Sequence, residues 1–341
     1  KKKVRDDIIE RLRIGEVDIA VGTHALIQDD VKFKSLSLSV IDEQHRFGVD
    51  QRLALAAKGK FVDMLGMTAT PIPRTLMLTA YGDMDVSRLF DKPAGRIPID
   101  TRVMPIERLK DVTNALKRSI DSNAQVYWVC PLVEESEALE ISAAEDRYDQ
   151  LKSIFQDQVG IIHGRMNAEK KRAVMESFAN GTTKILVATT VIEVGVDVPE
   201  ATVMVVEHAE RFGLAQLHQL RGRIGRGSIQ STCLLLYASP LTPMAEARLK
   251  IMRETDDGFY IAEEDLKLRG AGEMLGTRQS GLPNFRIADL TVHADLLLSA
   301  RNDAELILNR DKERTSERGK ALRILLYLFE RDAAIRNLRS G

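Results

Sequence analysis

Short apolar runs alternate with helix-like stretches from residue 18 as far as Tyr237, and this alternation most constrains the fold. Strands that alternate with helices pair in parallel, because each helix returns the chain to the same end of the sheet. The predicted fold class is therefore α/β, with parallel sheets flanked by helices. We predict a first helix at 4–14 and strands at 18–21, 36–41, 61–67, 101–104, 125–129, 159–162 and 184–188.

Length and composition set the outer limits. The 341 residues suffice for two domains or two and a small appendage, and 44% apolar and 29% charged residues are typical of a soluble protein. The net charge of -1 neither supports nor excludes a nucleic-acid partner. Cys130 and Cys233 lie in apolar runs, so we expect core residues of a reducing compartment.

The sequence shows neither a membrane-spanning segment nor a signal sequence. No apolar run approaches membrane-spanning length and no signal sequence opens the chain, so we expect a cytoplasmic protein without a membrane partner. The first residue is Lys1 and not Met, and the charged helical pattern there is typical of the middle of a domain. We therefore expect a fragment of a longer protein.

An arginine cluster follows a helical stretch at residues 214–227. Leucines recur there at helical spacing, and glycines then interrupt Arg221, Arg223 and Arg226. Guanidinium groups are planar, forked and permanently charged, so such a cluster beside flexible backbone suits a phosphate chain. The alternative is a solvated basic turn. The polar residues that end the preceding strands favour the phosphate-binding interpretation.

Two strand ends in the first part of the chain carry polar motifs. Asp42 and Glu43 follow the first of these strands and precede Gln44 and His45. Two adjacent carboxylates can divide labour, one holding a hydrated magnesium ion and the other orienting or deprotonating water. A bare acidic pair is more often a polar loop, but the Gln-His that follows makes chance less probable. The next strand leads into Thr68-Ala69-Thr70, whose hydroxyls can relay a hydrogen-bond change.

A second alternating unit begins after a turn-rich segment at 91–98, where we place a hinge. His163 and Arg165 follow one strand of this unit, and Asn167 is expected to cap the next helix. A core histidine is an equal alternative to a phosphate contact for His163. Thr189, Thr190, Glu193, Gly195 and Asp197 follow the next strand. The acidic stretch 134–150 is expected to be a surface helical insertion without chemistry.

Taken together, these motifs resemble the motor of superfamily two helicases, in which two RecA-like domains trap ATP. The resemblance implies that Asp42 and Glu43 hold magnesium, and that Glu43 prepares the hydrolytic water with Gln44 and His45 beside it. It further implies that Arg223 and Arg226 reach the γ-phosphate as arginine fingers. It places Gln219, Gly195 and Asp197 at the nucleotide, and Thr68, Thr70, His163, Arg165, Thr189 and Thr190 in DNA binding or coupling.

Two helices expected at 243–256 and 260–268 precede a glycine-rich loop at 268–281. A flexible linker is the alternative, but linkers rarely hold Arg269, Arg278 and Gln279 at such spacing. The hairpin and loop resemble the translocation motif shared by the RecG and Mfd families of duplex-DNA translocases, which implies coupling roles for these three residues. Gln44, the Gly276-Thr277-Arg278-Gln279 run and the short tail favour the RecG family.

The resemblance also implies a domain plan and a set of partners. We expect ATP and Mg²⁺ as cofactors, branched and duplex DNA as substrates, a single-stranded-DNA-binding protein as partner, and a monomer. The low aromatic content of 5% favours gripping duplex phosphates over stacking on bases. An Mfd-type translocase and a non-enzymatic duplex-binding or docking module stay open as alternatives. The expected domains are a partial RecA-like domain at 1–95, a complete one at 96–240, the hairpin and loop at 241–285, and C-terminal helices at 286–341, including 288–308 and 320–338.

The printed sequence contains no G-x-x-x-x-G-K-[ST] phosphate loop, since its Gly-Lys pairs at 59–60 and 319–320 stand in other contexts. The 341-residue polypeptide alone is therefore expected not to hydrolyse ATP appreciably, with or without DNA. A phosphate-release assay checks this. Robust DNA-stimulated release by this polypeptide would contradict the expectation.

Overall fold

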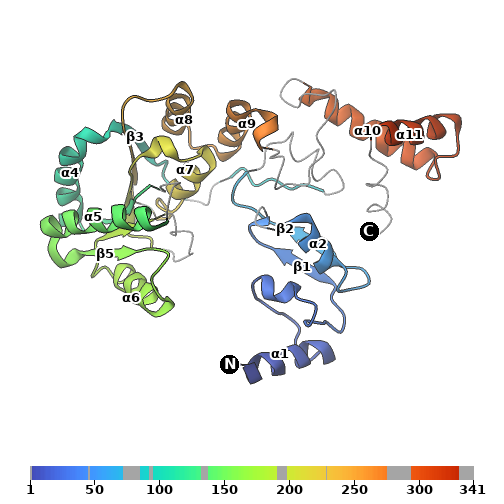
Figure 1. Ribbon diagram of the computed structural model, residues 1–341, viewed down its shortest axis with the longest axis horizontal. Helices are drawn as coiled ribbons and strands as arrows, with labels where there is room; N and C mark the ends of the chain where they lie inside the picture. The colour runs from blue at the N-terminus through green and yellow to red at the C-terminus, as the bar shows by residue number, and fades with distance from the viewer. Residues whose placement is uncertain are drawn as a thin grey trace. The chain divides into compact units, whose positions relative to one another are not determined.

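The computed structural model contains two compact units, which we describe separately (Figure 1). Residues 1–71 and 272–285 form the first unit, and residues 72–271 and 286–341 form the second. The four domain limits expected from the sequence stay predictions. The structure describes residues 2–44, 47–71, 85–91, 95–131, 137–189, 198–227, 229–274 and 293–329.

The first unit contains a pair of parallel strands, β1 (Leu38–Ile41) and β2 (Asp63–Gly66), with Ile41 opposite Gly66. Ile41 is buried, whereas Leu38 and Val40 are exposed. Side chains alternate between the two faces of a strand, so one face of β1 packs inward and the other faces outward. The helical elements of this unit are α1 (Lys2–Ile14), η1 (His24–Ile27) and α2 (Val49–Ala56).

One predicted strand of this unit is wrong. Residues 18–21 have no regular structure, and the side chains of Ile19 and Val21 are 81% and 94% exposed. Within the described residues no strand pairs with this segment. Without a ladder partner, an extended segment neither buries its side chains nor satisfies its backbone groups. The strand predicted at 61–67 is shorter than expected, because β2 pairs with the four residues of β1 only over 63–66, and Phe61 is exposed.

The second unit is built on a sheet of six parallel strands, which confirms the α/β class. The spatial order is β3-β8-β7-β4-β6-β5. Every position of β7 is buried, as expected of a strand covered on both faces. Sequence analysis did not assign β7. The strands are β3 (Asp100–Pro105), β4 (Gln125–Val129), β5 (Val159–Ile162), β6 (Ile185–Ala188), β7 (Ala201–Val206) and β8 (Thr232–Tyr237).

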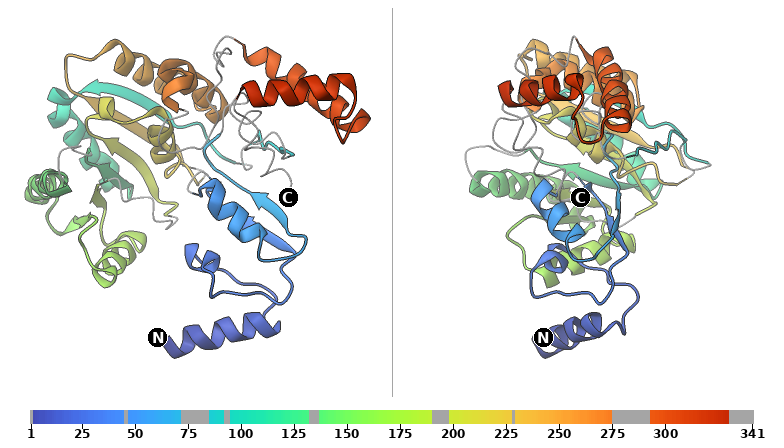
Figure 2. Two further views of the ribbon diagram at one scale, coloured as in Figure 1. Left: turned by 45° about the vertical axis from the view of Figure 1, so that its right-hand side comes forward. Right: turned by 90° about the vertical axis from the view of Figure 1, so that its right-hand side faces the viewer.

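Helices cover both faces of this sheet (Figure 2). One core cluster contains residues of α4 (Leu109–Asp121) and α5 (Glu137–Phe155). The other contains residues of four later helices. Short connections between strands and helices leave the polar residues after each strand at one edge of the sheet. The four helices are α6 (Ala168–Ala179), α7 (Leu214–Arg221), α8 (Pro243–Glu254) and α9 (Gly258–Met274).

Helix α5 corrects the expected surface insertion at 134–150. Ala144, Leu151 and Phe155 are buried, and the helix packs against β5 and β6. These residues recur at helical spacing, so they form an apolar stripe facing the sheet, while the acidic residues lie on the outer side. The acidic composition concealed this stripe.

The helices after the sheet also differ in length from those expected. Helix α9 continues to Met274, so Arg269 lies in a helix and not at the start of a loop. A glycine inside a helix costs only about 1 kcal/mol relative to alanine, and buried Ile261 and Leu266 anchor the preceding turns. The last helices are α10 (Ala294–Arg310) and α11 (Glu317–Leu328).

Both cysteines are buried, which confirms their expected place in the core. Burial raises the pKa of the Cys233 thiol to about 12, so this side chain stays protonated at neutral pH. None of the helices in the described part of the chain is long and apolar enough to cross a membrane.

The packing of α5 predicts a clear difference between its two sides. Leu151→Ala should lower the free energy of unfolding by about 3 kcal/mol, because it leaves a cavity against the sheet. Ile154→Ala, on the same helix but 42% exposed, should change it by no more than about 0.5 kcal/mol. Urea denaturation followed through Trp128, the single tryptophan, measures both. If both substitutions lowered the free energy of unfolding by the same small amount, α5 would not pack into the core.

Candidate nucleotide and DNA site

In the first unit, the acidic motif and the threonine motif lie together at the carboxyl edge of β1 and β2. The Met67 amide donates to the Ile41 carbonyl at 2.8 Å, and the Gln44 amide donates to the Met67 carbonyl at 2.9 Å. These bonds continue the parallel ladder beyond the ends of the strands. The structure therefore brings the loop of Asp42, Glu43 and Gln44 beside the segment that leads into Thr68.

The backbone at the acidic pair is held in an unusual conformation. Glu43 has φ 50°, in the left-handed region that non-glycine residues rarely adopt. Its amide donates to Asp42 Oδ1 at 2.9 Å, which fixes the turn. Such strained positions concentrate at functional sites, where the surrounding structure maintains them. Within this pair, the Asp42 side chain is exposed and that of Glu43 is half-buried.

Gln44 connects the two motifs through its side chain. It is buried and packs against Gly66, where an added Cβ atom would lie 2.0 Å from Gln44 Oε1 and would displace this amide. Beyond Gly66, the Thr70 amide donates to Thr68 Oγ1 at 3.2 Å, a turn that holds the hydroxyl close to the strand end. His45 lies outside the described residues.

In the second unit, two predicted site residues lie at the carboxyl edge of neighbouring strands. His163 follows β5 and Thr189 follows β6, and the Thr189 amide donates to the Ile162 carbonyl at 3.4 Å. Arg165 is exposed in the turn before α6, while Thr189 is buried. Asn167 caps α6 as predicted, because its Oδ1 accepts from the Lys170 amide at 2.8 Å. Thr190, Glu193, Gly195 and Asp197 lie outside the described residues.

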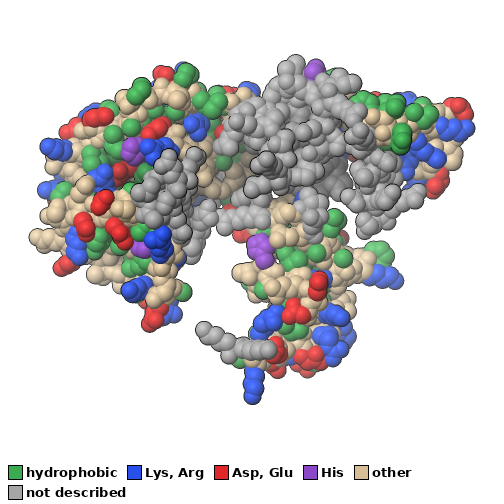
Figure 3. Space-filling model, in the orientation of Figure 1, with side chains coloured by type: hydrophobic (Ala, Val, Ile, Leu, Met, Phe, Trp, Pro, Cys, Tyr) green, Lys and Arg blue, Asp and Glu red, His purple; other side chains and the backbone are tan. Residues whose placement is uncertain are grey.

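Charge on this unit is mixed over the visible face. Figure 3 shows Lys and Arg side chains interspersed with Asp and Glu, in keeping with the net charge of -1. A uniformly basic face is not seen there. Local basic groups lie beside the carboxyl edge of β5, where Arg165 is exposed and Lys171 Nζ donates to the Gly164 carbonyl at 2.9 Å.

The arginine cluster divides into one buried and two accessible residues. Leu214 and Leu217 bury the inner face of α7, as the leucine spacing predicted. Arg221 lies on the same inner side and is only 2% exposed, whereas Arg223 is half-buried and Arg226 is exposed. The three arginines therefore do not form a single phosphate clamp, and this part of the interpretation is wrong.

Arg221 instead joins α7 to the end of α8. Its Nη1 donates to the carbonyls of Met252 at 2.8 Å and Thr255 at 2.9 Å, and its Nη2 donates to His218 Nδ1 at 3.1 Å. Burial lowers the pKa of the guanidinium from its ordinary value, and these acceptors compensate for the lost water. The last carbonyls of a helix need donors, and Arg221 supplies them.

A second arginine makes a similar connection that sequence analysis missed. Arg248 of α8 donates from Nη1 to the Phe212 carbonyl at 2.8 Å and from Nη2 to the Glu210 carbonyl at 3.0 Å. Phe212 lies just before Gly213, the N-cap of α7. Arg221 therefore joins the end of α7 to the end of α8, and Arg248 joins α8 to the segment that leads into α7.

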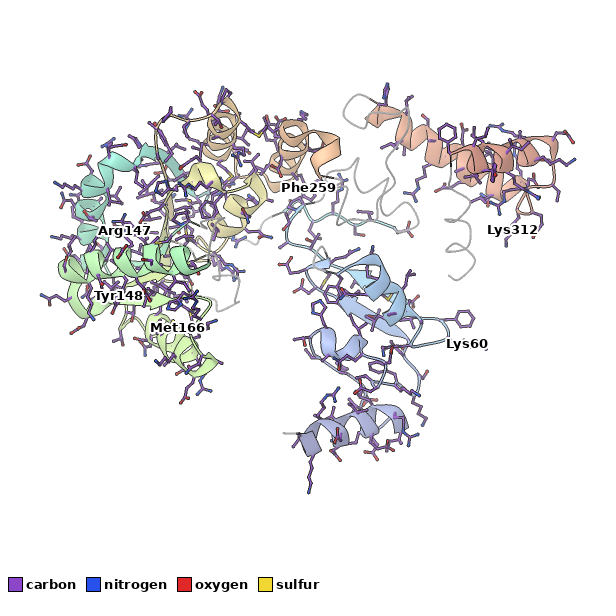
Figure 4. The ribbon with its side chains drawn as sticks, in the orientation of Figure 1. Lys60, Arg147, Tyr148, Met166, Phe259 and Lys312 are labelled. Carbon is purple, nitrogen blue, oxygen red and sulfur yellow. The ribbon has the colours of Figure 1, made fainter. Side chains whose placement is uncertain are left out.

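Sequence analysis also missed a buried ionic cluster at the carboxyl edge of β7. Glu207 Oε2 accepts from Arg147 Nη2 at 2.9 Å, and Glu207 Oε1 accepts from Trp128 Nε1. Arg147 lies on α5 (Figure 4). Its Cζ is 5.8 Å from the centre of the Trp128 ring. Burial and the Glu207 charge raise the pKa of the neighbouring Cys130 thiol. A single acidic residue after an apolar strand gave too little signal to identify this cluster.

The six-stranded parallel sheet with helices on both faces defines a RecA-like helicase fold. Residues 107–228 match the helicase conserved C-terminal domain, and residues 1–79 match the DEAD/DEAH box helicase model. Residues 255–326 match a third model, the C-terminal part of domain 3 of the ATP-dependent DNA helicase RecG.

Whole-chain relatives identify the family. The chain is 50% identical over 312 residues to the ATP-dependent DNA helicase RecG of Acidithiobacillus ferridurans, which covers 91% of this chain and 46% of the relative. It is 52% identical over 296 residues to the Escherichia coli K12 protein of the same name, covering 85% and 43%. The chain belongs to the RecG family, and it spans about half the length of these relatives.

A solved structure agrees with this assignment. The structure of RecG bound to a three-way DNA junction is 44% identical in sequence and superimposes with a TM-score of 0.64. The match covers 87% of this chain and 38% of that chain. The α/β fold expected from the sequence is thus shared with a solved member of the family.

The buried position of Arg221 predicts a stability effect that an exposed arginine lacks. Arg221→Met should lower the free energy of unfolding by about 3 kcal/mol, because it leaves buried carbonyls without a donor. Arg253→Met, on α8 with a side chain 57% exposed, should change it by no more than about 0.5 kcal/mol. Thermal and urea unfolding of both variants measure the difference. A near-neutral Arg221→Met would show that its hydrogen bonds are dispensable.

Proposed function

We propose that this chain is the motor part of an ATP-dependent double-stranded DNA translocase that remodels branched DNA in recombination and repair. The reactions proposed are fork regression and branch migration of Holliday junctions. The proposal rests on sequence identity. Over 85–91% of the chain, about half of the aligned residues are identical to those of proteins named ATP-dependent DNA helicase RecG.

The acidic edge of the first unit supplies the proposed hydrolytic groups. Asp42 would hold Mg²⁺, with Glu43 as a further metal contact and the group that orients the attacking water. The donor set suits this ion, because Mg²⁺ is commonly held by one or two carboxylates together with substrate phosphates. The fixed turn at Glu43 and its position at a strand end support the assignment. Gln44 and His45 would complete this catalytic set.

The accessible arginines of the second unit supply the proposed γ-phosphate contacts. Arg223 and Arg226 would act as arginine fingers, with Gln219, Gly195 and Asp197 also at the nucleotide. A finger of this kind is worth about a thousandfold or more in rate. The difference in burial from Arg221 supports the assignment. Arg221 is buried, whereas Arg226 follows α7 and is exposed, with its Nε donating to the Gly222 carbonyl at 3.4 Å.

The carboxyl edges also supply the proposed DNA contacts. His163, Arg165, Thr189 and Thr190 would contact backbone phosphates, and Thr68 and Thr70 would couple the nucleotide state to DNA grip. Arg269, Arg278 and Gln279 would transmit motor movement to the duplex. The bonds of Arg221 to the end of α8, and of Arg248 to the segment before α7, support this coupling. They join the helix that precedes Arg223 and Arg226 to the hairpin that contains Arg269.

Several properties of the whole protein are proposed on the same basis. A solved RecG is bound to a three-way DNA junction, and we propose the same class of branched substrate here. A monomer, a cytoplasmic location and a single-stranded-DNA-binding protein as partner are likewise proposals. An Mfd-type translocase is less favoured, since residues 255–326 match a RecG model.

The motor proposal predicts the loss of hydrolysis when the acidic pair is altered. The test uses a hybrid enzyme in which this chain replaces the matching segment of the Escherichia coli relative. Glu43→Gln should lower DNA-stimulated ATP hydrolysis by about a hundredfold or more, because it removes the proposed base while preserving size. The matched control is Asp63→Asn, an exposed acid at the start of β2, which should leave hydrolysis unchanged.

Binding measurements separate this proposal from the alternatives. Duplex binding that survives in Glu43→Gln agrees with a motor whose chemical step alone is lost. If the hybrid hydrolyses ATP equally well with and without Glu43→Gln, the acidic pair is not catalytic. If the hybrid binds duplex DNA but never hydrolyses ATP, the non-enzymatic binding module is favoured.

A further inference from the structure

The junction between α8 and α9 is held by two separate segments of the second unit. Arg221 of α7 bonds to the carbonyls of Met252 and Thr255 on one side of this junction. The segment 85–91 contacts the first turn of α9 through Phe259. This segment lies between the boundary of the two units at residues 71 and 72 and the first strand of the large sheet.

The second contact is made by one aromatic ring and one cation. The ring centres of Phe90 and Phe259 are 5.1 Å apart and their planes are tilted by 44°. The Arg88 Cζ atom lies 5.7 Å from the centre of the Phe259 ring. Tilted rings and a cation over a ring face are both favoured by the ring quadrupole, so the two contacts act together on Phe259.

Phe259 is itself fixed in the first turn of α9 (Figure 4). Asp257 Oδ1 accepts from the Phe259 amide at 2.9 Å and from the Tyr260 amide at 3.3 Å. This carboxylate satisfies donors that the start of a helix leaves without partners. A force applied to the Phe259 ring therefore acts on the helix and not on a loose loop.

These contacts do not belong to the folding core. Phe90 is 72% exposed and its neighbour Leu89 is 90% exposed. Among the described residues, the two core clusters include neither Phe90 nor Phe259. Removing the Phe90 ring should leave the sheet and its helices folded. An effect of this change on α9 would then reflect positioning.

We propose that Arg88, Phe90 and Phe259 form an aromatic clip through which the segment joining the two units sets the position of α9. The chain passes between the two units after residues 71, 271 and 285, and this segment follows the first of these passages. A change in the relative orientation of the units would act on the segment through that passage. The clip would transmit part of that movement to α9, the helix that contains Arg269. This contact is separate from the hydrogen bonds through which Arg221 holds the end of α8. The three are positioning residues, and their role in translocation rests on the proposed function.

Hydrogen–deuterium exchange of the 341-residue chain tests the clip directly. In Phe90→Ala, amides of residues 258–268 should exchange about fivefold faster, the ratio expected when one aromatic pair is lost from an opening equilibrium. Amides of β4 should be unaffected. Leu89→Ala is the matched control, because it removes a comparable exposed side chain from the same segment. Unchanged exchange in Phe90→Ala, or an equal increase in Leu89→Ala, would overturn the proposal.

A double-mutant cycle tests whether the two rings act as a pair. Phe259→Leu keeps an apolar side chain but removes the ring, and it should accelerate exchange of α9 as Phe90→Ala does. The double variant should exchange no faster than Phe259→Leu alone, because that substitution already removes the ring that both Phe90 and Arg88 contact. Additive effects would show that each ring stabilises α9 independently, which contradicts the clip.

The hybrid enzyme tests the consequence for coupling. Phe90→Ala should raise the ATP consumed per converted three-way junction about threefold, within the range by which residues between two sites alter coupling. Phe90→Tyr retains the ring and should restore the parent ratio. A parent hybrid without DNA-stimulated hydrolysis would refute the motor, while the exchange experiment would still decide the clip. An active parent with an unchanged ratio in Phe90→Ala would refute the coupling role.

Discussion

The parallel direction of the strands is the constraint on which the rest of this structure depends. In a parallel ladder every strand ends at the same edge, so residues far apart in sequence meet there. The amide of Thr189 bonds to the carbonyl of Ile162 for this reason, and the loop at Gln44 bonds to the segment before Thr68. The residues proposed at the strand ends, such as Glu43, Thr68, His163 and Thr189, are brought to the edge of their sheet by this arrangement.

The packing of α7 decides which arginine at its end is buried and which are accessible. Its leucines bury one face, and at the last position of that face the chain places Arg221. A buried guanidinium needs several acceptors, and the free carbonyls at the end of α8 provide them. Arg223 and Arg226 fall beyond the buried face, where Gly225 has φ 70° and turns the chain. Packing thus distinguishes a positioning arginine from two accessible ones.

Sequence periodicity predicted the strands at 125–129 and 159–162 and the polar motifs at their ends, because buried parallel strands leave a strong local pattern. Periodicity failed where the structure of a segment depends on a partner far away in the sequence. Residues 18–21 have an apolar pattern but no ladder partner in the described part of the chain, and α5 has an acidic composition but a buried stripe. Glu207 and Arg221 are defined by partners remote in sequence, which no local pattern reveals.

The length of α9 determines how far a movement at its junction with α8 is transmitted. Had the helix ended at Leu268, as the glycines indicated, a shift at Phe259 would dissipate in a loop before Arg269. Because the helix continues to Met274, Phe259 and Arg269 lie on one hydrogen-bonded rod, about 15 Å apart along its axis. A helix transmits displacement and rotation over such a distance with little loss. The contacts of Arg221 and Phe259 near its first turn therefore act at the end where small movements can orient the whole helix.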